Sequence, residues 1–429
     1  MFKAVPSRVS FPELDSRVLQ QWKDQDIFHR AESEREDGPL FMLFEGPPTA
    51  NGSPGIHHVL ARVFKDVICR YRTMKGYRCQ RKGGWDTHGL PVELEIEKEL
   101  GLSSKREIEE YGIEKFNQQC RDSVFRYVKE WEVMTDRIGF WVDMEHPYVT
   151  LENDYIESGW WILKQLWDRG LLYEGLRGTP HCPRCETSLS SHEVALGYRE
   201  DTPDPSVFVK FKAETWTDGN PPPVLTYLLA WTTTPWTLPG NTALAVDENA
   251  EYSVIELEQE GGVQRLVVAT PLLAANLRQE YTLVGALKGS ELVGIRYQPL
   301  YHPGQYNTEI RLFVQREGAS GATVADLEST TEFAPQVVAG DFVSMEDGTG
   351  IVHIAPAFGD EDLTLGRDKE LAFVQPVDLQ GNVTGSYPFA GKFVKDADAD
   401  IMADLQQRGL VYHRDIYRHT YPFCWRCDT

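Results

Sequence analysis

The stretch Phe41-Met-Leu-Phe-Glu-Gly-Pro-Pro-Thr-Ala-Asn-Gly-Ser-Pro-Gly-Ile-His-His58 determines how the first part of the chain folds. An apolar run is followed by a segment rich in glycine and proline, and apolar residues then recur at helical spacing from Val59 to Met74. Gly76 ends that helix, and a second short strand is expected at residues 77–81, before a loop at residues 83–89. Strand, glycine-rich loop, helix and strand together predict an α/β fold that opens a parallel, doubly wound sheet.

Helices are expected on both sides of this unit. Ser10 with Glu13 three residues later predicts a capping box at the start of an amphipathic helix. Two further helices fit residues 114–137 and 153–168. The second is predicted to bury its apolar residues, which are Ile156, Trp160, Leu163 and Trp167.

The composition is that of a folded protein with several domains. A chain of 429 residues is expected to form roughly two to four domains, and 41% hydrophobic and 11% aromatic residues suffice for packed cores. No apolar run approaches the ~18–20 residues that span a bilayer, and the first residues lack a signal-peptide core. We therefore expect a cytoplasmic protein with no membrane partner.

The chain is acidic, with 43 basic and 65 acidic residues and a formal charge of −22. This balance excludes a basic coat that binds nucleic acid over the whole surface. Between Arg62 and Lys82, however, the basic residues greatly outnumber the single acid, Asp66. That stretch is the candidate for a locally positive face, and a solvated helix face is the alternative of equal weight.

Four of the seven cysteines form two pairs of the same spacing, His181-Cys182-Pro-Arg-Cys185 and Phe423-Cys424-Trp-Arg-Cys427. Two Cys-x-x-Cys knuckles can supply the four thiolates of a closed structural zinc site, and two separate redox motifs are the alternative. Convergence on one ion requires that the long segment between the pairs leave and re-enter one host domain.

The residue pattern changes after the first knuckle. From about Pro205 to Val394, β-branched runs alternate with glycine and proline turns, which predicts a mainly antiparallel, barrel-like β domain. The runs are Val207–Phe211, Tyr252–Leu257, Leu266–Ala269 and Ile351–Ile354. We therefore predict four consecutive segments. Residues 1–180 form an N-terminal helix and the first half of the host core, and residues 181–200 form the first knuckle and a linker. Residues 201–394 form the inserted domain, and residues 395–429 return to the core.

Two groups of residues carry possible chemistry. His57 and His58 follow the glycine-rich segment at a helix start, where free backbone N–H groups and imidazoles can bind phosphate; a plain turn with surface histidines is the alternative. Leu229-Ala-Trp-Thr-Thr-Thr-Pro-Trp-Thr-Leu-Pro-Gly-Asn241 and Gly348-Thr-Gly-Ile-Val-His-Ile-Ala-Pro-Ala-Phe-Gly-Asp-Glu-Asp362 form the second group. Its hydroxyl row can position water or an ester carbonyl, although such threonines alone are usually plain strand residues.

These strings, with Gly84-Trp-Asp-Thr-His-Gly-Leu-Pro-Val-Glu93 and both knuckles, closely resemble the N-terminal part of the isoleucyl-tRNA synthetase family, which are class I aminoacyl-tRNA synthetases. The resemblance runs from about Phe2 to Thr429. It implies the first half of a Rossmann-type catalytic core with an inserted editing domain and a four-cysteine zinc knuckle. It also implies a monomer that uses ATP with Mg²⁺ to activate isoleucine, transfers it to tRNA(Ile), and hydrolyses misactivated or mischarged valine.

The resemblance also implies residue roles in the core. Pro47 and Asp86 would hold the α-ammonium group of the substrate, with Gly46 and His88 beside them. Asn51 and His58 match positions that face ATP. The family pattern His-x-Gly-His reads Gly55-Ile-His-His58 here, so Gly55 removes one imidazole from the phosphate side. We favour the interpretation that His57 supplies the missing imidazole; a decayed motif is the alternative.

In the inserted domain, the resemblance implies a hydrolytic pocket. Asp362 would hold the α-ammonium group of a misattached amino acid, and His353 would contact the terminal ribose or the amino acid. The pocket would be lined by Thr232, Thr233, Thr234, Thr237 and Asn241. No Ser-His-Asp triad is evident in these strings, and none is needed, because a positioned water can attack an ester that is already activated.

The family continues beyond the residues present here, with a lysine-rich ATP loop and an anticodon-binding helical domain. We therefore expect that adenylate formation by this chain alone is impaired while editing survives. Two other readings stay open: an aminoacyl-tRNA hydrolase that only edits, and a non-catalytic fragment that binds zinc and tRNA.

Overall fold

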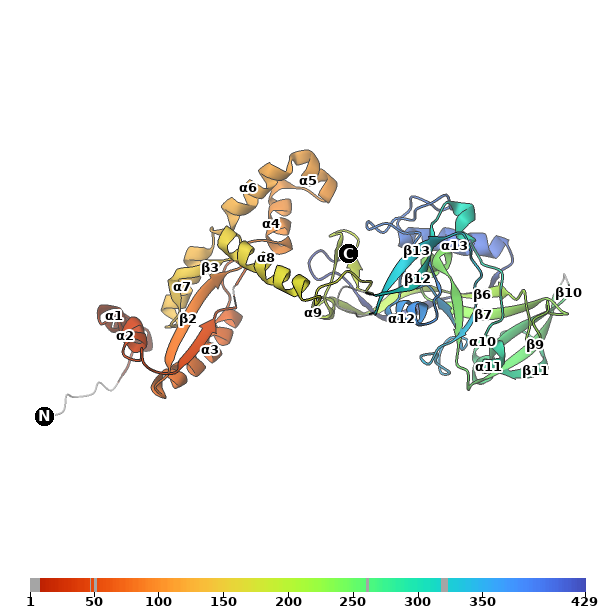
Figure 1. Cartoon of the computed structure of the whole chain (residues 1–429), viewed down its shortest axis with the longest axis horizontal. Helices are drawn as coiled ribbons and strands as arrows, with labels where there is room; N and C mark the ends of the chain where they lie inside the picture. The colour runs from red at the N-terminus through yellow and green to blue at the C-terminus, as the bar shows by residue number, and fades with distance from the viewer. Residues whose placement is uncertain (1–7, 47, 50–51, 260–261, 318–322) are drawn as a thin grey trace. The chain divides into compact units, whose positions relative to one another are not determined.

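The computed structural model describes residues 8–46, 48–49, 52–259, 262–317 and 323–429 (Figure 1). Contacts divide the chain into two compact units, Met1–Asp168 and Arg169–Thr429. Within the described residues, no helix combines the length and apolar character needed to cross a membrane.

A parallel sheet of three strands forms the centre of the first unit. Its order is β1 (Leu40–Phe44), β2 (Arg78–Trp85) and β3 (Asp143–Val149). Helix α3 (Ile56–Met74) connects β1 to β2 and lies along β2 (Figure 1). Because the strands run in one direction, the segments that follow them meet at one edge of the sheet. The predicted order of strand, glycine-rich loop, helix and strand is confirmed.

Strand β2 is longer than the sequence indicated, because Gly83, Gly84 and Trp85 belong to the strand and not to a loop. A Cβ atom on Gly84 would lie 2.3 Å from the ring of Tyr148 on β3, and one on Gly83 would lie 2.6 Å from the carbonyl oxygen of Asp143. The glycines therefore allow close approach of two paired strands, and the prediction of a loop there was wrong.

The described part of the first unit contains seven other helices: α1 (Phe11–Asp24), α2 (Ile27–Ser33), α4 (Leu90–Leu100), α5 (Lys105–Tyr111), α6 (Ile113–Val124), α7 (Val128–Arg137) and α8 (Asn153–Asp168). The single helix predicted at 114–137 is two helices, α6 and α7. Ser10 is the N-cap of α1, but its side chain makes no capping hydrogen bond, so the predicted capping box is wrong.

Helix α8 has the predicted bounds, yet its apolar side chains are exposed. The exposed fractions are 41% for Ile156, 68% for Trp160, 42% for Leu163 and 63% for Trp167, so the prediction that they are buried was wrong. Helical spacing predicts which face of a helix is apolar, but it does not predict whether another element covers that face.

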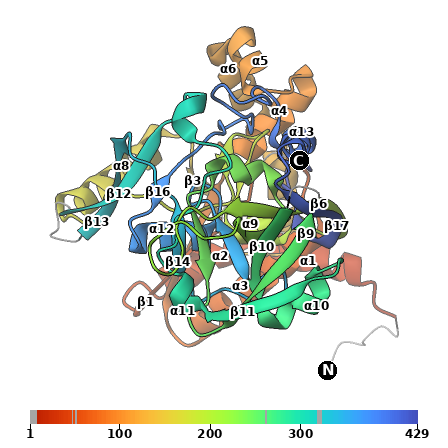
Figure 2. The ribbon, with the colours of Figure 1, turned by 90° about the vertical axis from the view of Figure 1, so that its right-hand side faces the viewer.

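A curled sheet of nine strands dominates the second unit (Figure 2). Its strands are β6 (Tyr198–Lys212), β7 (Thr226–Thr232), β8 (Ala243–Val246), β9 (Glu251–Gln259), β10 (Gly262–Ala269), β11 (Thr282–Lys288), β14 (Gln336–Ala339), β15 (Ile351–Ile354) and β17 (Val411–Pro422). Most pairs are antiparallel, as predicted, but β7 pairs in parallel with β10 and β15, and β8 with β14. The four β-branched runs lie in β6, β9, β10 and β15.

Smaller elements surround this sheet. They are the hairpin β4 (His181–Cys182) and β5 (Thr187–Ser188), the three-stranded sheet β12 (Ile310–Glu317), β13 (Thr323–Thr330) and β16 (Ala372–Phe373), the helices α9 (Ser191–Ala195), α10 (Leu273–Asn276), α11 (Gly289–Leu292), α12 (Asp360–Asp368) and α13 (Val394–Gln407), and the 3₁₀ turns η1 (Pro235–Gly240), η2 (Thr270–Leu272) and η3 (Pro303–Tyr306). Phe211, Tyr252 and Tyr297 are fully buried in the main core.

Candidate functional site

The four paired cysteines come together in the second unit. Their sulfur atoms all lie within 4.8 Å of one another, and Sγ of Cys427 is 3.5 Å from that of Cys182 and 3.6 Å from that of Cys185. Tetrahedral zinc with Zn–S bonds of ~2.3 Å requires S···S separations of about 3.8 Å, so the donor set fits a closed four-thiolate site. The prediction that the two distant pairs converge is confirmed, and the cluster can hold a metal ion.

Local backbone geometry builds the two knuckles in the same way. The residue after the second cysteine of each pair, Glu186 or Asp428, has a positive φ, 48° and 62° respectively. In the first knuckle, the backbone N–H of Cys185 donates to Sγ of Cys182. An ion pair between Glu193 and Arg426 joins the two sides. Each knuckle is therefore a tight turn that aims both of its sulfurs inward.

In the first unit, the segments after the three parallel strands meet at the edge where the sequence motifs predict a nucleotide site. Asp86 donates its backbone N–H to the carbonyl oxygen of Pro48 at 3.1 Å, and Thr49 forms a parallel bridge with Asp86. His88 lies 2.8 Å from Oγ1 of Thr150, in the segment after β3. Gly46 is exposed beside this edge. Pro47 and Asn51 lie outside the described residues, so the structure does not place them.

The two histidines lie at the start of α3, whose N-cap is Gly55. Nδ1 of His58 accepts the backbone N–H of Gly55 at 2.9 Å, and the two imidazole rings are 3.8 Å apart. A Cβ atom on Gly55 would lie 2.7 Å from the ring of His57. The imidazole of His57 therefore occupies the space where a side chain at position 55 would begin. Burial lowers the pKa of His58, and His57 and Arg62 lower it further.

Trp131 of α7 contacts Gly52, His58 and Arg62 at this edge, and the sequence motifs did not identify it. Its indole N–H donates to the carbonyl oxygen of Gly52 at 2.8 Å, and its ring lies 4.5 Å from that of His58. The guanidinium of Arg62 lies 4.8 Å from the same ring. Trp131 is far from Gly52 and His58 in sequence, and no motif around it predicts these contacts.

The basic stretch between Arg62 and Lys82 does not form a continuous exposed positive face. Arg62 and Arg81 are buried, at 4% and 3% exposed. Arg81 and Arg70 both pair with Asp66, and Lys65 pairs with the buried Glu45. Lys65, Arg70 and Arg81 therefore neutralise acids inside the first unit, which a count of charges along the sequence cannot show.

The threonine row and His353 meet in the second unit, because β15 pairs with β7 and Val352 lies opposite Trp231. Thr232 ends β7, Thr233 and Thr234 follow it, and Thr237 and Asn241 lie in and after η1. The Oγ1 atoms of Thr232 and Thr234 are 3.2 Å apart, and those of Thr234 and Thr237 are 3.3 Å apart. The structure thus joins Thr232, Thr234, Thr237, Asn241 and His353 through hydrogen bonds. Asp362 bonds to Ala355, two residues beyond His353.

His353 is 8% exposed, and both of its ring nitrogens have partners. Nε2 is 3.0 Å from Oγ1 of Thr237, and Nδ1 is 2.8 Å from Nδ2 of Asn241. Burial lowers the pKa of His353 to about 4, so the ring is neutral at neutral pH. A neutral, buried imidazole with both nitrogens engaged can orient its neighbours, but it has no free nitrogen to act as a base.

Asp362 lies in the first turn of α12, where backbone N–H groups favour a negative charge. Its Oδ2 accepts the backbone N–H of Ala355 at 2.8 Å. Burial nevertheless raises its pKa to about 6, and it has no ion-pair partner among the described residues. A half-buried carboxylate without a cation is suited to bind an ammonium group, which would lower its pKa again.

Asp398 of α13 was also not identified from the sequence. It is 3% exposed, and its Oδ1 accepts the backbone N–H of Trp236 at 2.7 Å, which fixes the start of η1. The ring of Trp236 lies 4.9 Å from that of Phe358, just before α12. Burial raises the pKa of Asp398 to about 7, Lys395 opposes this rise, and Asp204 reinforces it.

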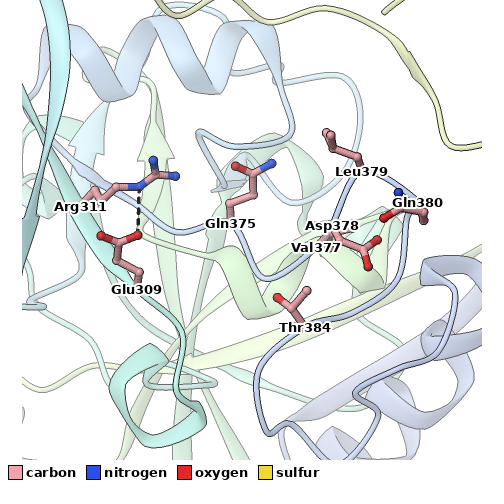
Figure 3. Close-up of a pocket in the computed structure, with 8 residues that line it drawn as sticks. All are labelled: Glu309, Arg311, Gln375, Val377, Asp378, Leu379, Gln380 and Thr384. Atoms are coloured by element: carbon pink, nitrogen blue, oxygen red, sulfur yellow. Dashed lines mark ion pairs between the residues drawn. The ribbon is translucent and has the colours of Figure 1, made fainter. Parts of the chain in front are cut away.

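A separate hollow of about 470 Å³ lies on the second unit (Figure 3). Its lining includes Glu309 and Arg311, which form an ion pair at 3.9 Å, and the segment 375–384. It contains none of the predicted site residues. We assign it no role.

Comparisons with known proteins place this chain in a family. The profile described as "tRNA synthetases class I (I, L, M and V)" matches residues 17–352. The chain therefore belongs to the class I tRNA synthetases of this group. Its relatives include proteins named "Isoleucine--tRNA ligase" from Dehalococcoides mccartyi strain CBDB1, Clostridium kluyveri and Bacillus thuringiensis strain Al Hakam, which are 52%, 46% and 47% identical to it.

Each of these relatives is matched along 100% of this chain, but the chain spans only 42%, 38% and 38% of their lengths. A solved structure, "The crystal structure of GlLeuRS-CP1", matches 49% of this chain and 98% of its own, with 16% sequence identity and a TM-score of 0.35. This low score supports no argument about the fold.

The cysteine cluster predicts the effect of metal removal. We expect the purified chain to hold one metal ion, and a chelator to increase hydrogen exchange in β4, β5 and the turn after β17, while β9 and β10 stay protected. Elemental analysis and hydrogen exchange by mass spectrometry measure both effects. Cys427→Ser should behave like the chelated protein, and Cys120→Ser, outside the cluster, like the wild type. A metal-free chain with a protected hairpin would contradict the assignment.

The buried carboxyl of Asp398 predicts a pH effect on stability. Its pKa is raised to about 7 in the folded chain, against about 3.9 in an unfolded one, so the folded state binds the extra proton. Stability from this group is therefore present below pH 4 and is lost as the pH rises to 7. Asp398→Asn keeps an oxygen acceptor for Trp236 and cannot ionise. The Tm of Asp398→Asn minus that of the wild type should increase from pH 4 to pH 7; a constant difference would contradict this.

Proposed function

We propose that this chain carries the N-terminal part of an isoleucine–tRNA ligase. The complete protein would use ATP and Mg²⁺ to form isoleucyl-adenylate, transfer isoleucine to tRNA(Ile), and hydrolyse valine that has been activated or attached in error. The family match and the names of the relatives support this proposal. Within the chain, the observation that carries it is the hydrogen-bonded group of Thr237, Asn241 and His353 beside the threonine row.

The first unit would bind isoleucine and ATP at the edge where the parallel strands end. Ligands of open α/β sheets bind at this edge, and the N-terminus of α3 offers free N–H groups to phosphate. Asp86, with Pro47, would pair with the substrate ammonium group, because a desolvated ammonium needs an anionic partner. His58 and Asn51 would face ATP. His57 would supply the second imidazole, since its ring covers Gly55.

The second unit would hold the editing pocket. Asp362 would pair with the ammonium group of misattached valine, and Thr232, Thr233 and Thr234 would orient the ester and a water molecule. The water oxygen adds to the ester carbonyl, the bond to the ribose oxygen breaks, and a proton passes to that oxygen. Free valine and tRNA with its terminal hydroxyl restored are the products. His353 would hold Thr237 in place and would not itself remove the proton, because both of its nitrogens are engaged.

A second site is needed because the first cannot discriminate well enough. One methylene in a hydrophobic pocket is worth only ~1–3 kcal/mol, a general value for which isoleucine–tRNA ligases are the standard example. A cavity too small for isoleucine can accept valine, so hydrolysis there removes the smaller amino acid. The four thiolates would hold a structural zinc ion, which fixes the two ends of the inserted segment.

The two units differ in how completely their apolar surfaces are covered. In the first unit, α3 exposes Leu60, Phe64 and Val67 at 61%, 66% and 60%. In the second unit, a large continuous core is closed around the sheet. We therefore propose that this chain alone edits but does not form adenylate. The closed second unit also favours the alternative of a hydrolase that only edits, whereas a non-catalytic fragment would leave the threonine row unused.

Two assays test the proposal. We expect the purified chain to release valine from valyl-tRNA(Ile), and to catalyse no isoleucine-dependent pyrophosphate exchange. Asp362→Ala should lower the release at least tenfold, because truncation leaves the ammonium group unpaired. Glu361→Ala, which alters the neighbouring exposed carboxylate, is the matched control and should retain activity. Release of valine at the uncatalysed rate by the wild-type chain would contradict the editing proposal.

A further inference from the structure

Tyr297 lies at the far end of the hydrogen-bonded group and belongs to none of the motifs. It is fully buried, and its ring packs edge-on against Phe211 at 5.3 Å. Its hydroxyl donates to Oδ1 of Asn241 at 2.8 Å. In the group, which we call the Tyr297 relay, hydrogen bonds run from Tyr297 through Asn241 and His353 to Thr237 and Thr234.

The direction of each bond follows from the donors and acceptors. Nδ2 of Asn241 is 2.9 Å from the carbonyl oxygen of Ala243, which can only accept, so the amide nitrogen must face that oxygen. The second hydrogen of the same nitrogen points to Nδ1 of His353, which must therefore carry no proton. The proton of the neutral ring is then on Nε2 and is donated to Oγ1 of Thr237.

Thr237 completes the relay. Its hydroxyl accepts from Nε2 of His353 and donates to the carbonyl oxygen of Thr234 at 2.8 Å. Its own hydrogen is therefore committed to the backbone, and its oxygen faces the row of hydroxyls in one defined state. The orientation of Thr237 thus depends on which nitrogen of His353 carries the proton.

From this chain of bonds we infer that Tyr297 is a positioning residue of the editing pocket, acting through Asn241 and His353 to fix Thr237; this rests on the proposed function. The hydroxyl of Tyr297 is the donor that satisfies Oδ1 of Asn241 in a buried site. Without it, that oxygen has no donor among the described residues, and the amide of Asn241 is free to turn away from Nδ1 of His353. Nδ1 then loses the donor that keeps it unprotonated, so the proton of the ring can move to Nδ1, and the bond from Nε2 to Thr237 is lost.

The experiment compares Tyr297→Phe with Tyr252→Phe in the complete 429-residue chain. Tyr252 is an equally buried tyrosine of the same core, and its hydroxyl bonds only to backbone, the carbonyl oxygen of Gly350 and the N–H of Asp247. Both variants remove one buried hydroxyl, so general loss of stability should be similar. Nitrogen-15 NMR of histidine-labelled protein reports the tautomer of His353, whose signals are assigned as those absent from His353→Gln.

We expect the wild type and Tyr252→Phe to show the tautomer protonated on Nε2, and Tyr297→Phe to show a mixture or the tautomer protonated on Nδ1. Tyr297→Phe should also lower kcat for valine release roughly tenfold, as expected for one unsatisfied buried acceptor, with little change in KM. Asn241→Asp, which replaces the donor with an acceptor, should move the proton to Nδ1 and serves as the positive control for the NMR signal.

An unchanged tautomer in Tyr297→Phe would overturn the inference, whatever the rate of valine release. A wild-type chain that releases no valine would contradict the proposed function only, because the NMR comparison does not depend on activity. An equal change in the tautomer of His353 in Tyr297→Phe and in Tyr252→Phe would also overturn the inference. It would show that the core loosens whenever a buried hydroxyl is removed, and not that Tyr297 acts specifically through Asn241.

Discussion

The antiparallel pairing of β6 with β17 is the constraint on which the second unit depends. Its register places Tyr198 opposite Pro422, so the two ends of a long segment leave and return side by side. Immediately beyond this pair, the four cysteine sulfurs lie within 4.8 Å of one another. Hydrogen bonds and thiolates therefore close the same long loop, and loop closure costs little more entropy for a long segment than for a short one.

The core of that sheet encloses the polar groups of the Tyr297 relay, and each of them has a hydrogen-bond partner. Burying an unpaired polar group costs about 1–3 kcal/mol, so a relay of buried tyrosine, asparagine and histidine is stable only when each donor meets an acceptor. The relay meets this condition in one arrangement of protons. Such an arrangement holds Thr237 in one orientation, as the proposed editing pocket would require.

The sequence motifs predicted those features of the fold that depend on residues close to one another in the chain. The order of β1, α3 and β2, the bounds of α8 and the pairing of the cysteines could all be predicted, since each follows from spacing along the chain. The exposure of Trp160 could not be predicted, because periodicity does not reveal whether another element covers an apolar face. Tyr297, Asp398 and Trp131 act on motif residues far away in sequence, and their identities alone carry no sign of those contacts. Gly84 was assigned to a loop because its role, close approach to Tyr148, exists only in the folded sheet.

The electrostatics of the two carboxylates near the threonine row separate their roles. Burial raises both pKa values, but the carboxyl of Asp398 accepts a backbone N–H that anchors η1, while Asp362 lies at a helix start and lacks a cation. A buried acid near neutrality can change protonation without a ligand, whereas a carboxylate stabilised by α12 gains most when an ammonium group arrives. Under the proposed function, Asp398 would hold η1 in place and Asp362 would bind the ammonium group of the substrate. The neutral His353 would add no charge that repels that ammonium group.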